Sequence, residues 1–270
     1  MATISVTYDS TLSRLRIAVT GLVGTAVTAK FERAIQDVGI WSTVRGGSSV
    51  NVSGAAASLD DYEWPSDPGS DLNYRVTAYD VSGVQVDQVT EFDAVAPALD
   101  SIWAKIPAAP YLNMPITVVD RSAIERKSRA GLFPIVGRSK PVMVGDVAGS
   151  LQFELQLLTE NAADERNLDY LFASGEVLFL HLPAGVEHFP GGYYAVGDVT
   201  RETTLRLSAR RVWTVPLTEV APPGPDVIGS AYTWASAVAE YATWADLIAD
   251  NLTWADLLQR TGTPSDVIVP

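Results

Sequence analysis

Three neighbouring acids have the clearest capacity for acid–base chemistry in this chain. Asp60, Asp61 and Glu63 lie close together and flank Tyr62. Glycoside hydrolysis needs two carboxyl groups that face each other across a gap of about 5–10 Å. Acids on one turn do not supply that facing pair, so we interpret the cluster as an acidic turn ahead of a strand.

The two histidines, His181 and His188, are the candidate metal ligands. Glu187 or Asp198 could act as a third ligand, but the sequence has no His-Glu-x-x-His-type spacing. His181 lies inside an apolar stretch, and His188 stands beside the Phe-Pro-Gly-Gly sequence of a loop. We therefore predict two structural histidines, and neither a metal ion nor any other cofactor.

The usual nucleophile and phosphate-binding motifs are missing as well. The absence of cysteine excludes disulfides, thiolate metal sites and cysteine nucleophiles. Residues 137–141 lack the second glycine of a Gly-x-Ser-x-Gly elbow. Residues 46–49 have neither the lysine nor the spacing of a phosphate loop. We predict a protein that has no catalytic residues and is not an enzyme.

The chain is acidic, with a formal net charge of −13 over 270 residues. Nucleic-acid binding requires surface that neutralises phosphates, so we expect no stable nucleic-acid binding. No stretch approaches the ~18 apolar residues that a membrane span requires. Residues 1–6 enter strand-like sequence without the basic and apolar regions of a signal peptide. We expect a protein that is made in the cytoplasm and is not inserted into a membrane.

One basic run stands out in this acidic chain. Its members are Arg121, Arg126, Lys127, Arg129, Arg138 and Lys140. A local DNA contact is one interpretation, but Phe133 is the only aromatic residue interleaved with these cations. Gly131 and Pro134 favour a loop. We expect a basic loop that docks on an acidic neighbour, with Arg126, Lys127 and Arg129 as contact residues.

The C-terminal segment contains a repeat with an interval of ten residues. Thr-Trp-Ala occurs at 233–235, 243–245 and 253–255. Each threonine stands three residues before Ser236, Asp246 or Asp256, which is a variant of the capping box. A step of ten leaves a helix about 80° short of whole turns, so one continuous helix would not align the tryptophans. The spacing predicts three short helical turns.

The tryptophans of these repeats have two interpretations. Trp234, Trp244 and Trp254 could stack on sugars, or they could fill pockets on another protein. Leu247 and Leu257 lie between and beside them, and such apolar neighbours favour protein anchors. We predict that residues 223–270 are an assembly arm.

The hydrophobic pattern predicts a mainly β chain, α+β overall, in three parts. Leu15, Ile17 and Val19 alternate with polar or small residues, which indicates a β-sandwich over residues 1–96. Residues 94–98 form the expected linker. Residues 99–222 combine an alternating strand at 151–157 with a helix at about 159–174 and further strands.

Five residues define the expected helix and the last strand of this second domain. Thr159 is the expected N-cap, and Gly175 is the expected stop. Trp213, with Val215 and Leu217, should form one face of the last strand. A connector at 222–225 leads to the arm.

The first part of the chain resembles a fibronectin type III domain. Tyr74–Asp80 followed by Gly83 is similar to the end of such a domain. The resemblance implies that Trp41 is the core aromatic residue. It also implies that Tyr74 is a corner tyrosine whose hydroxyl bonds back across the corner.

Most of the chain resembles minor tail proteins of long-tailed, siphovirus-type phages that infect actinobacteria. The segments that carry this likeness are Gly137–Val144, Gly175–Leu180, Tyr193–Asp198 and Arg211–Pro216. Their order is also similar, more distantly, to the tail-tube-like β-barrel or sandwich of distal tail proteins.

The resemblance implies a structural protein of the virion tail tip or baseplate, made in the host cytoplasm. It implies a ring of copies at the distal end of the tail tube. The tube, the tape measure and further tip proteins would then be its partners. The alternative is a secreted or cell-surface carbohydrate-binding module.

Overall fold

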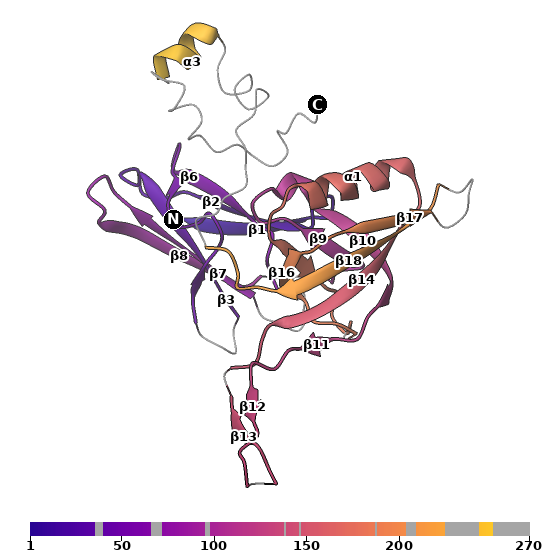
Figure 1. Ribbon diagram of the computed structural model, residues 1–270. Helices are drawn as coiled ribbons and strands as arrows, with labels where there is room; N and C mark the ends of the chain where they lie inside the picture. Colours follow the sequence, from indigo (N-terminus) through magenta and orange to yellow (C-terminus); the bar gives the residue numbers. More distant parts are fainter. Residues whose placement is uncertain are drawn as a thin grey trace. The chain divides into compact units, whose positions relative to one another are not determined.

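A computed structural model describes residues 1–35, 40–65, 72–94, 98–137, 139–145, 147–186, 188–203, 209–224 and 243–250 (Figure 1). The protein is mainly β, with 49% strand and 9% helix, as the hydrophobic pattern predicts. It consists of two compact units. The first contains Met1–Pro115, His181–Val186 and the described residues from Pro223 onward, and the second contains Ile116–Leu180 and Glu187–Pro222.

Two antiparallel sheets build the first unit. The smaller has the order β1-β2-β6, and the larger has the order β4-β3-β7-β8 with β5 also paired to β3. Their bounds are β1 Thr3–Asp9, β2 Arg14–Thr20, β3 Thr28–Ile35, β4 Ser42–Thr43, β5 Val50–Asn51, β6 Ala56–Asp61, β7 Leu72–Tyr79 and β8 Gln85–Ala94. Leu15, Ile17 and Val19 of β2 are buried in a core shared by both sheets, which confirms the predicted alternation.

The core aromatic residue of this unit is Trp64, and the expectation for Trp41 is wrong. Trp64 is buried in the shared core, whereas Trp41 is only half-buried. The guanidinium of Arg75 lies 4.3 Å from the ring centroid of Trp41. Arg75 alternates along β7 with the buried residues Tyr74 and Val76, so Trp41 packs on the outer side of that strand.

Tyr74 is buried, but its hydroxyl does not bond to the backbone as a corner tyrosine would. It donates to Oδ2 of Asp61 at 2.9 Å. Asp61 is the last residue of β6, which lies in the other sheet. The tyrosine therefore links the two sheets through a buried carboxylate.

The shared core extends beyond the boundary expected near residue 97. Leu99 and Trp103 are buried in it together with the strands of the sandwich. The linker residues 95–97 themselves lie outside the described residues. The first unit therefore includes β9 (Ile102–Lys105) and the 3-10 helix η1 (Pro110–Leu112).

An eight-stranded sheet has the order β11-β14-β10-β9-β15-β16-β18-β17. Pairing of β14 with β18 closes six of these strands into a barrel. The bounds are β10 Met114–Arg121, β11 Glu125–Arg126, β14 Leu151–Thr159, β15 Leu178–His181, β16 Gly192–Val196, β17 Thr200–Thr203 and β18 Arg211–Glu219.

The seam of the barrel is built from the two strands with the clearest alternation. Phe153, Leu155 and Leu157 of β14 are buried, and they pair directly with three buried residues of β18. Those partners are Leu217, Val215 and Trp213. Both sets were predicted from the period of two, because inward and outward residues alternate along a strand.

Helix α1 (Ala162–Ala173) begins after Asn161, not after Thr159. The Asn161 side chain accepts hydrogen bonds from the backbone of Ala163 and Asp164, which makes it the N-cap. Thr159 still ends β14, where its hydroxyl accepts from Nε1 of Trp213 at 3.1 Å. Gly175 follows the helix at a φ of 68°, so the expected stop is confirmed.

The basic segment is a hairpin and not the predicted loop. β12 (Gly131–Phe133) pairs antiparallel with β13 (Val142–Val144) as a separate two-stranded sheet. A short helix of seven residues, α3 (Trp244–Asp250), is described in the C-terminal segment.

The start of α3 confirms the capping box predicted for the second repeat. Oγ1 of Thr243 accepts from the Asp246 backbone N–H at 3.3 Å. Oδ2 of Asp246 accepts in return from the Thr243 backbone N–H at 3.1 Å. The first and third repeats lie outside the described residues.

Candidate protein-interaction surface

The hairpin of β12 and β13 (residues 127–149) is the main candidate site. Below, the arm means this hairpin, which is a different part of the chain from the C-terminal segment 223–270. Leu132 pairs with Met143, and Phe133 pairs with Val142. In the described part of the chain, neither strand pairs with any other strand. An isolated two-stranded hairpin is marginally stable in water, so a partner would stabilise it.

The base of the arm is closed by backbone contacts around Gly149. Its N–H donates to the carbonyl of Lys127 at 2.9 Å. Its own carbonyl accepts from Nη1 of Arg126 at 2.9 Å. A Cβ at this glycine would lie 3.1 Å from the Lys127 carbonyl oxygen, which is tighter than most such contacts. The two chain segments therefore leave the sheet side by side.

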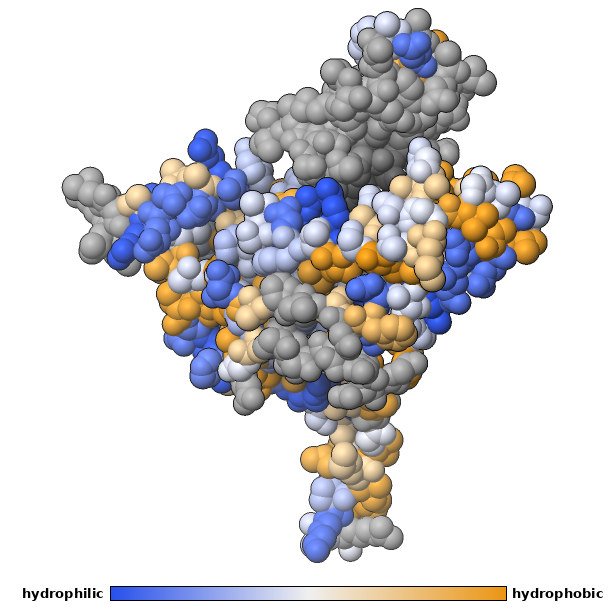
Figure 2. All heavy atoms as spheres, turned by 180° about the vertical axis from the view of Figure 1, so that it is seen from behind, coloured by the Kyte–Doolittle hydropathy of each residue, from blue (hydrophilic) through white to orange (hydrophobic). Residues whose placement is uncertain are grey.

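The arm exposes a row of large apolar side chains. Leu132 is 66% exposed and Phe133 is 56% exposed. The others are Ile135, Val136, Val142, Met143, Val144 and Val147. Figure 2 shows the arm as a projection with hydrophobic residues along much of its described length. Exposed apolar side chains in this number on one projection are typical of an interaction site.

The arm is also cationic. Residues 127–149 contain four basic residues against one acid, Asp146, in a chain of net charge −13. Lys127, Arg129 and Lys140 are exposed, and Arg138 lies outside the described residues. Two of the three predicted contact cations, Lys127 and Arg129, therefore stand at the base of an apolar hairpin.

Arg126, the third predicted contact cation, is engaged within its own chain. It lies in β11 and donates to Gly149, and its Nη2 is 3.6 Å from Oε2 of Glu219. The structure gives it a role in holding the base of the arm. Its predicted contact with a neighbour remains a prediction.

The C-terminal contact residues are described only in part. Trp244 is 62% exposed on α3, and its predicted role as an anchor remains a prediction. Leu247 is 7% exposed, so its side chain is covered and not presented. Trp234, Trp254 and Leu257 lie outside the described residues.

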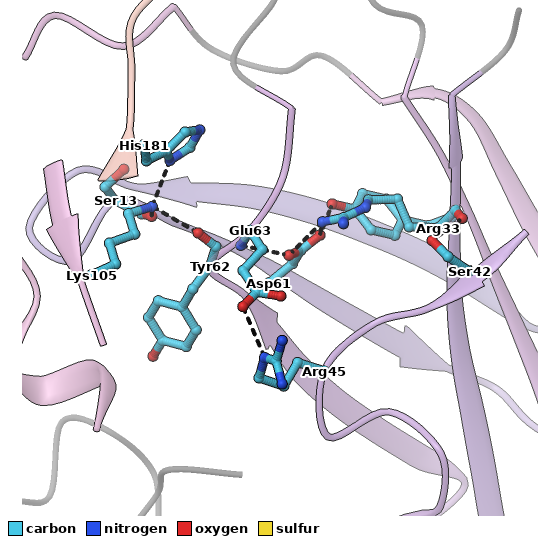
Figure 3. Close-up of polar contacts among 10 residues, drawn as sticks. Ser13, Arg33, Ser42, Arg45, Asp61, Tyr62, Glu63, Lys105 and His181 are labelled. Atoms are coloured by element: carbon cyan, nitrogen blue, oxygen red, sulfur yellow. Dashed lines mark hydrogen bonds and ion pairs between the residues drawn. The ribbon is translucent and has the colours of Figure 1, made fainter. Parts of the chain in front are cut away.

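A buried polar cluster in the first unit is the second candidate (Figure 3). Lys105 is 1% exposed, and its Nζ donates to the carbonyls of Ser13 at 2.6 Å and Tyr62 at 2.8 Å. The same Nζ lies 2.8 Å from Nδ1 of His181. The ring of His181 also packs edge-on against Trp64, at 4.8 Å between centroids.

Burial lowers the pKa of both groups in this contact. It lowers the pKa of Lys105 to about 7, although Asp61 and Glu63 oppose that shift. Burial, with the charges of Lys105 and Arg33, lowers the pKa of His181 to about 2. The histidine is therefore neutral at physiological pH. The lysine is too buried to meet a substrate, so it acts as a polar cross-link between segments of this unit.

Each of the three neighbouring acids, Asp60, Asp61 and Glu63, forms an ion pair with at least one arginine. Nη1 of Arg33 donates to both carboxylate oxygens of Asp61, at 2.8 and 2.6 Å. The other guanidinium pairs are Arg14 and Arg16 with Asp60, and Arg45 with Glu63. The acids are thus structural ion-pair partners. The predicted acidic turn is wrong for Asp60 and Asp61, which are the last two residues of β6.

The remaining candidate metal ligands do not form a described metal site. Asp198 and His188 are exposed, and Glu187 lies outside the described residues. Among the residues that the structure describes, no group of three or more histidine, aspartate or glutamate side chains could hold a metal ion. Neither described helix is long and apolar enough to cross a membrane.

Comparison with known proteins gives no assignment. No family model matches the sequence. No curated protein has significant sequence similarity to it.

Proposed function

We propose that this chain is a structural subunit of a bacteriophage tail tip. It forms a ring at the distal end of the tail tube and docks further tip proteins. The observation that carries the proposal is the exposed apolar and cationic arm, because such a surface is suited to assembly.

Two further features support an assembly role. A closed six-stranded barrel is a rigid platform that removes most sheet edges, so it can carry a projecting arm. Three polar side chains could in principle take part in acid–base chemistry. These residues, Asp60, Asp61 and Lys105, are already engaged in internal hydrogen bonds and ion pairs. They support a structural role better than a catalytic one.

Labelling of particles tests the proposal. Antibodies raised against the purified chain should label the tails of phage particles that encode it. In electron micrographs, gold particles that mark the bound antibody should lie at the distal end of the tube. Antibody depleted on the purified chain is the control. Particles that contain none of the protein would overturn the proposal, and binding of the purified chain to a glycan array would then favour the carbohydrate-binding alternative.

A further inference from the structure

The edge strand β8 and its flanking residues have the charge that complements the arm. Between Arg75 and Lys105 the sequence has no lysine or arginine. It has five acids there, which are Asp80, Asp87, Glu91, Asp93 and Asp100. This is the opposite composition to the arm, in which basic residues outnumber acids by four to one.

β8 also has the backbone and apolar features of a docking edge. It ends the sheet order β4-β3-β7-β8, so in the described part of the chain it pairs on one side only, with β7. Phe92 in this strand is 65% exposed. An open strand edge can accept a strand from another chain, with main-chain hydrogen bonds supplying affinity and side chains supplying specificity.

The charges on the two surfaces are available for such a contact. Within the described residues Lys127, Arg129 and Lys140 have no ion-pair partner, and neither does Glu91. Asp87 is partly used, since its carboxylate accepts from the backbone of Val23. Opposite charges across an interface steer association and fix its register.

We propose that the arm of one copy docks along the β8 edge of a second copy. The inference rests on the proposed function, because it supplies the contact that would join neighbouring subunits. The arm and β8 are different surfaces, so the contact is heterologous. A heterologous contact gives a closed ring when its rotation closes, and a filament when it does not.

Self-association of the full chain tests the inference first. Analytical ultracentrifugation should show concentration-dependent assembly that weakens as salt rises. The double variant Leu132→Ser/Phe133→Ser should raise the Kd by about tenfold or more, because it removes the apolar contact. Tyr170→Ser is the matched control, since Tyr170 is 52% exposed on α1 and should leave the Kd unchanged. Near-ultraviolet circular dichroism confirms that each variant is folded.

Charge reversal tests the identity of the two surfaces. Arg129→Glu/Lys140→Glu on the arm should weaken assembly, and so should Glu91→Lys on the edge. Mixing the two variants should restore it, because each reversed arm then meets a reversed edge and each native arm meets a native edge. Weakened assembly that mixing does not restore would overturn the pairing of arm and edge.

Cross-linking decides whether the contact joins different surfaces of different copies. The chain has no cysteine, so Ser139→Cys on the arm and Gln88→Cys on β8 are unique thiols. A short bis-maleimide should join the two variants when they are mixed, and should join neither to itself. Arm-to-arm products would overturn the heterologous contact.

Two other results would also overturn the inference. One is a chain that stays monomeric at every concentration. The other is arm-dependent sedimentation with phosphatidylserine vesicles without self-association, which would assign the arm to a membrane surface. Gold labelling of tails tests the proposed function independently, so failure of one can be distinguished from failure of the other.

Discussion

Single residues explain why the first unit holds polar groups in its interior. Lys105 was missed by sequence analysis, because an isolated lysine in a sequence normally predicts exposed surface. Its burial depends on acceptors from distant segments, Ser13 and Tyr62, and local patterns do not encode those. His181 was correctly expected to lie in an apolar strand, and the lysine beside it could not be predicted.

His181 should make the protein sensitive to acid. Its pKa of about 2 in the folded state lies below the 6.5 of an unfolded histidine. Acid therefore adds a proton to the unfolded state first, and stability falls as the pH drops below about 6.5. The expected loss is about 1.4 kcal/mol per pH unit. Urea titrations between pH 7 and 5 should show a shallower dependence for His181→Gln, whereas His188→Gln should match the unmodified protein.

Asp61 should be the most costly acid to neutralise. It accepts hydrogen bonds from Arg33, from Tyr74 and from the backbone N–H of Glu63. Asp61→Asn leaves the Arg33 charge without its counterion, so the free energy of unfolding should drop by about 3–5 kcal/mol. The exposed Asp198→Asn should change it by less than about 0.5 kcal/mol in the same urea titration. Equal effects for the two variants would contradict the structural role of Asp61.

At the scale of elements, the alternation of apolar and polar residues predicted the strands well. The N-cap residues predicted where the helices begin less well. The inward faces of β14 and β18 follow directly from the period of two in their sequences. The start of α1 was misplaced by two residues, since both Thr159 and Asn161 are acceptable caps and β14 extends over the first. The arm was expected to be a loop, because Gly131 and Pro134 are typical loop residues. Its strands β12 and β13 have only three residues each, which is too short for a clear alternation in the sequence.

The cap at Asn161 gives a direct test of where α1 begins. Asn161→Ala should lower the free energy of unfolding by about 1 kcal/mol, because two backbone N–H groups lose their acceptor. Asn161→Asp retains an acceptor oxygen and should preserve stability. Chemical denaturation followed by circular dichroism measures both. No effect of the alanine variant would mean that the helix begins elsewhere.

At the scale of the whole molecule, the two-part β architecture was predictable, and its boundary was not. Short strands and turn signals indicated a sandwich followed by a second β-domain, but closure of the barrel depends on the pairing of β14 with β18, far apart in the sequence. The first unit takes Trp103 and His181 from beyond the expected linker. Such long-range pairings leave no local signal in the sequence.

Fragment 1–96 should therefore fail to fold as an independent sandwich. It lacks Leu99 and Trp103 from the shared core and Lys105 from the polar cluster. Loss of one core tryptophan alone costs about 3–5 kcal/mol, which is a large part of the stability of a small domain. Urea unfolding should be broad and non-cooperative. A dispersed amide spectrum and a sharp transition would instead support the boundary near residue 97.

Mass photometry of the purified chain tests the central claim most directly. We expect particles at one whole-number multiple of the 29.0 kDa subunit, corresponding to a closed ring. Replacing residues 128–148 with a short glycine-serine link should reduce these particles to monomers, which are lighter than the 29.0 kDa full chain by the residues removed, while the far-ultraviolet spectrum remains that of a β protein. A monomer at every concentration, or a ring that persists without the arm, would contradict the account.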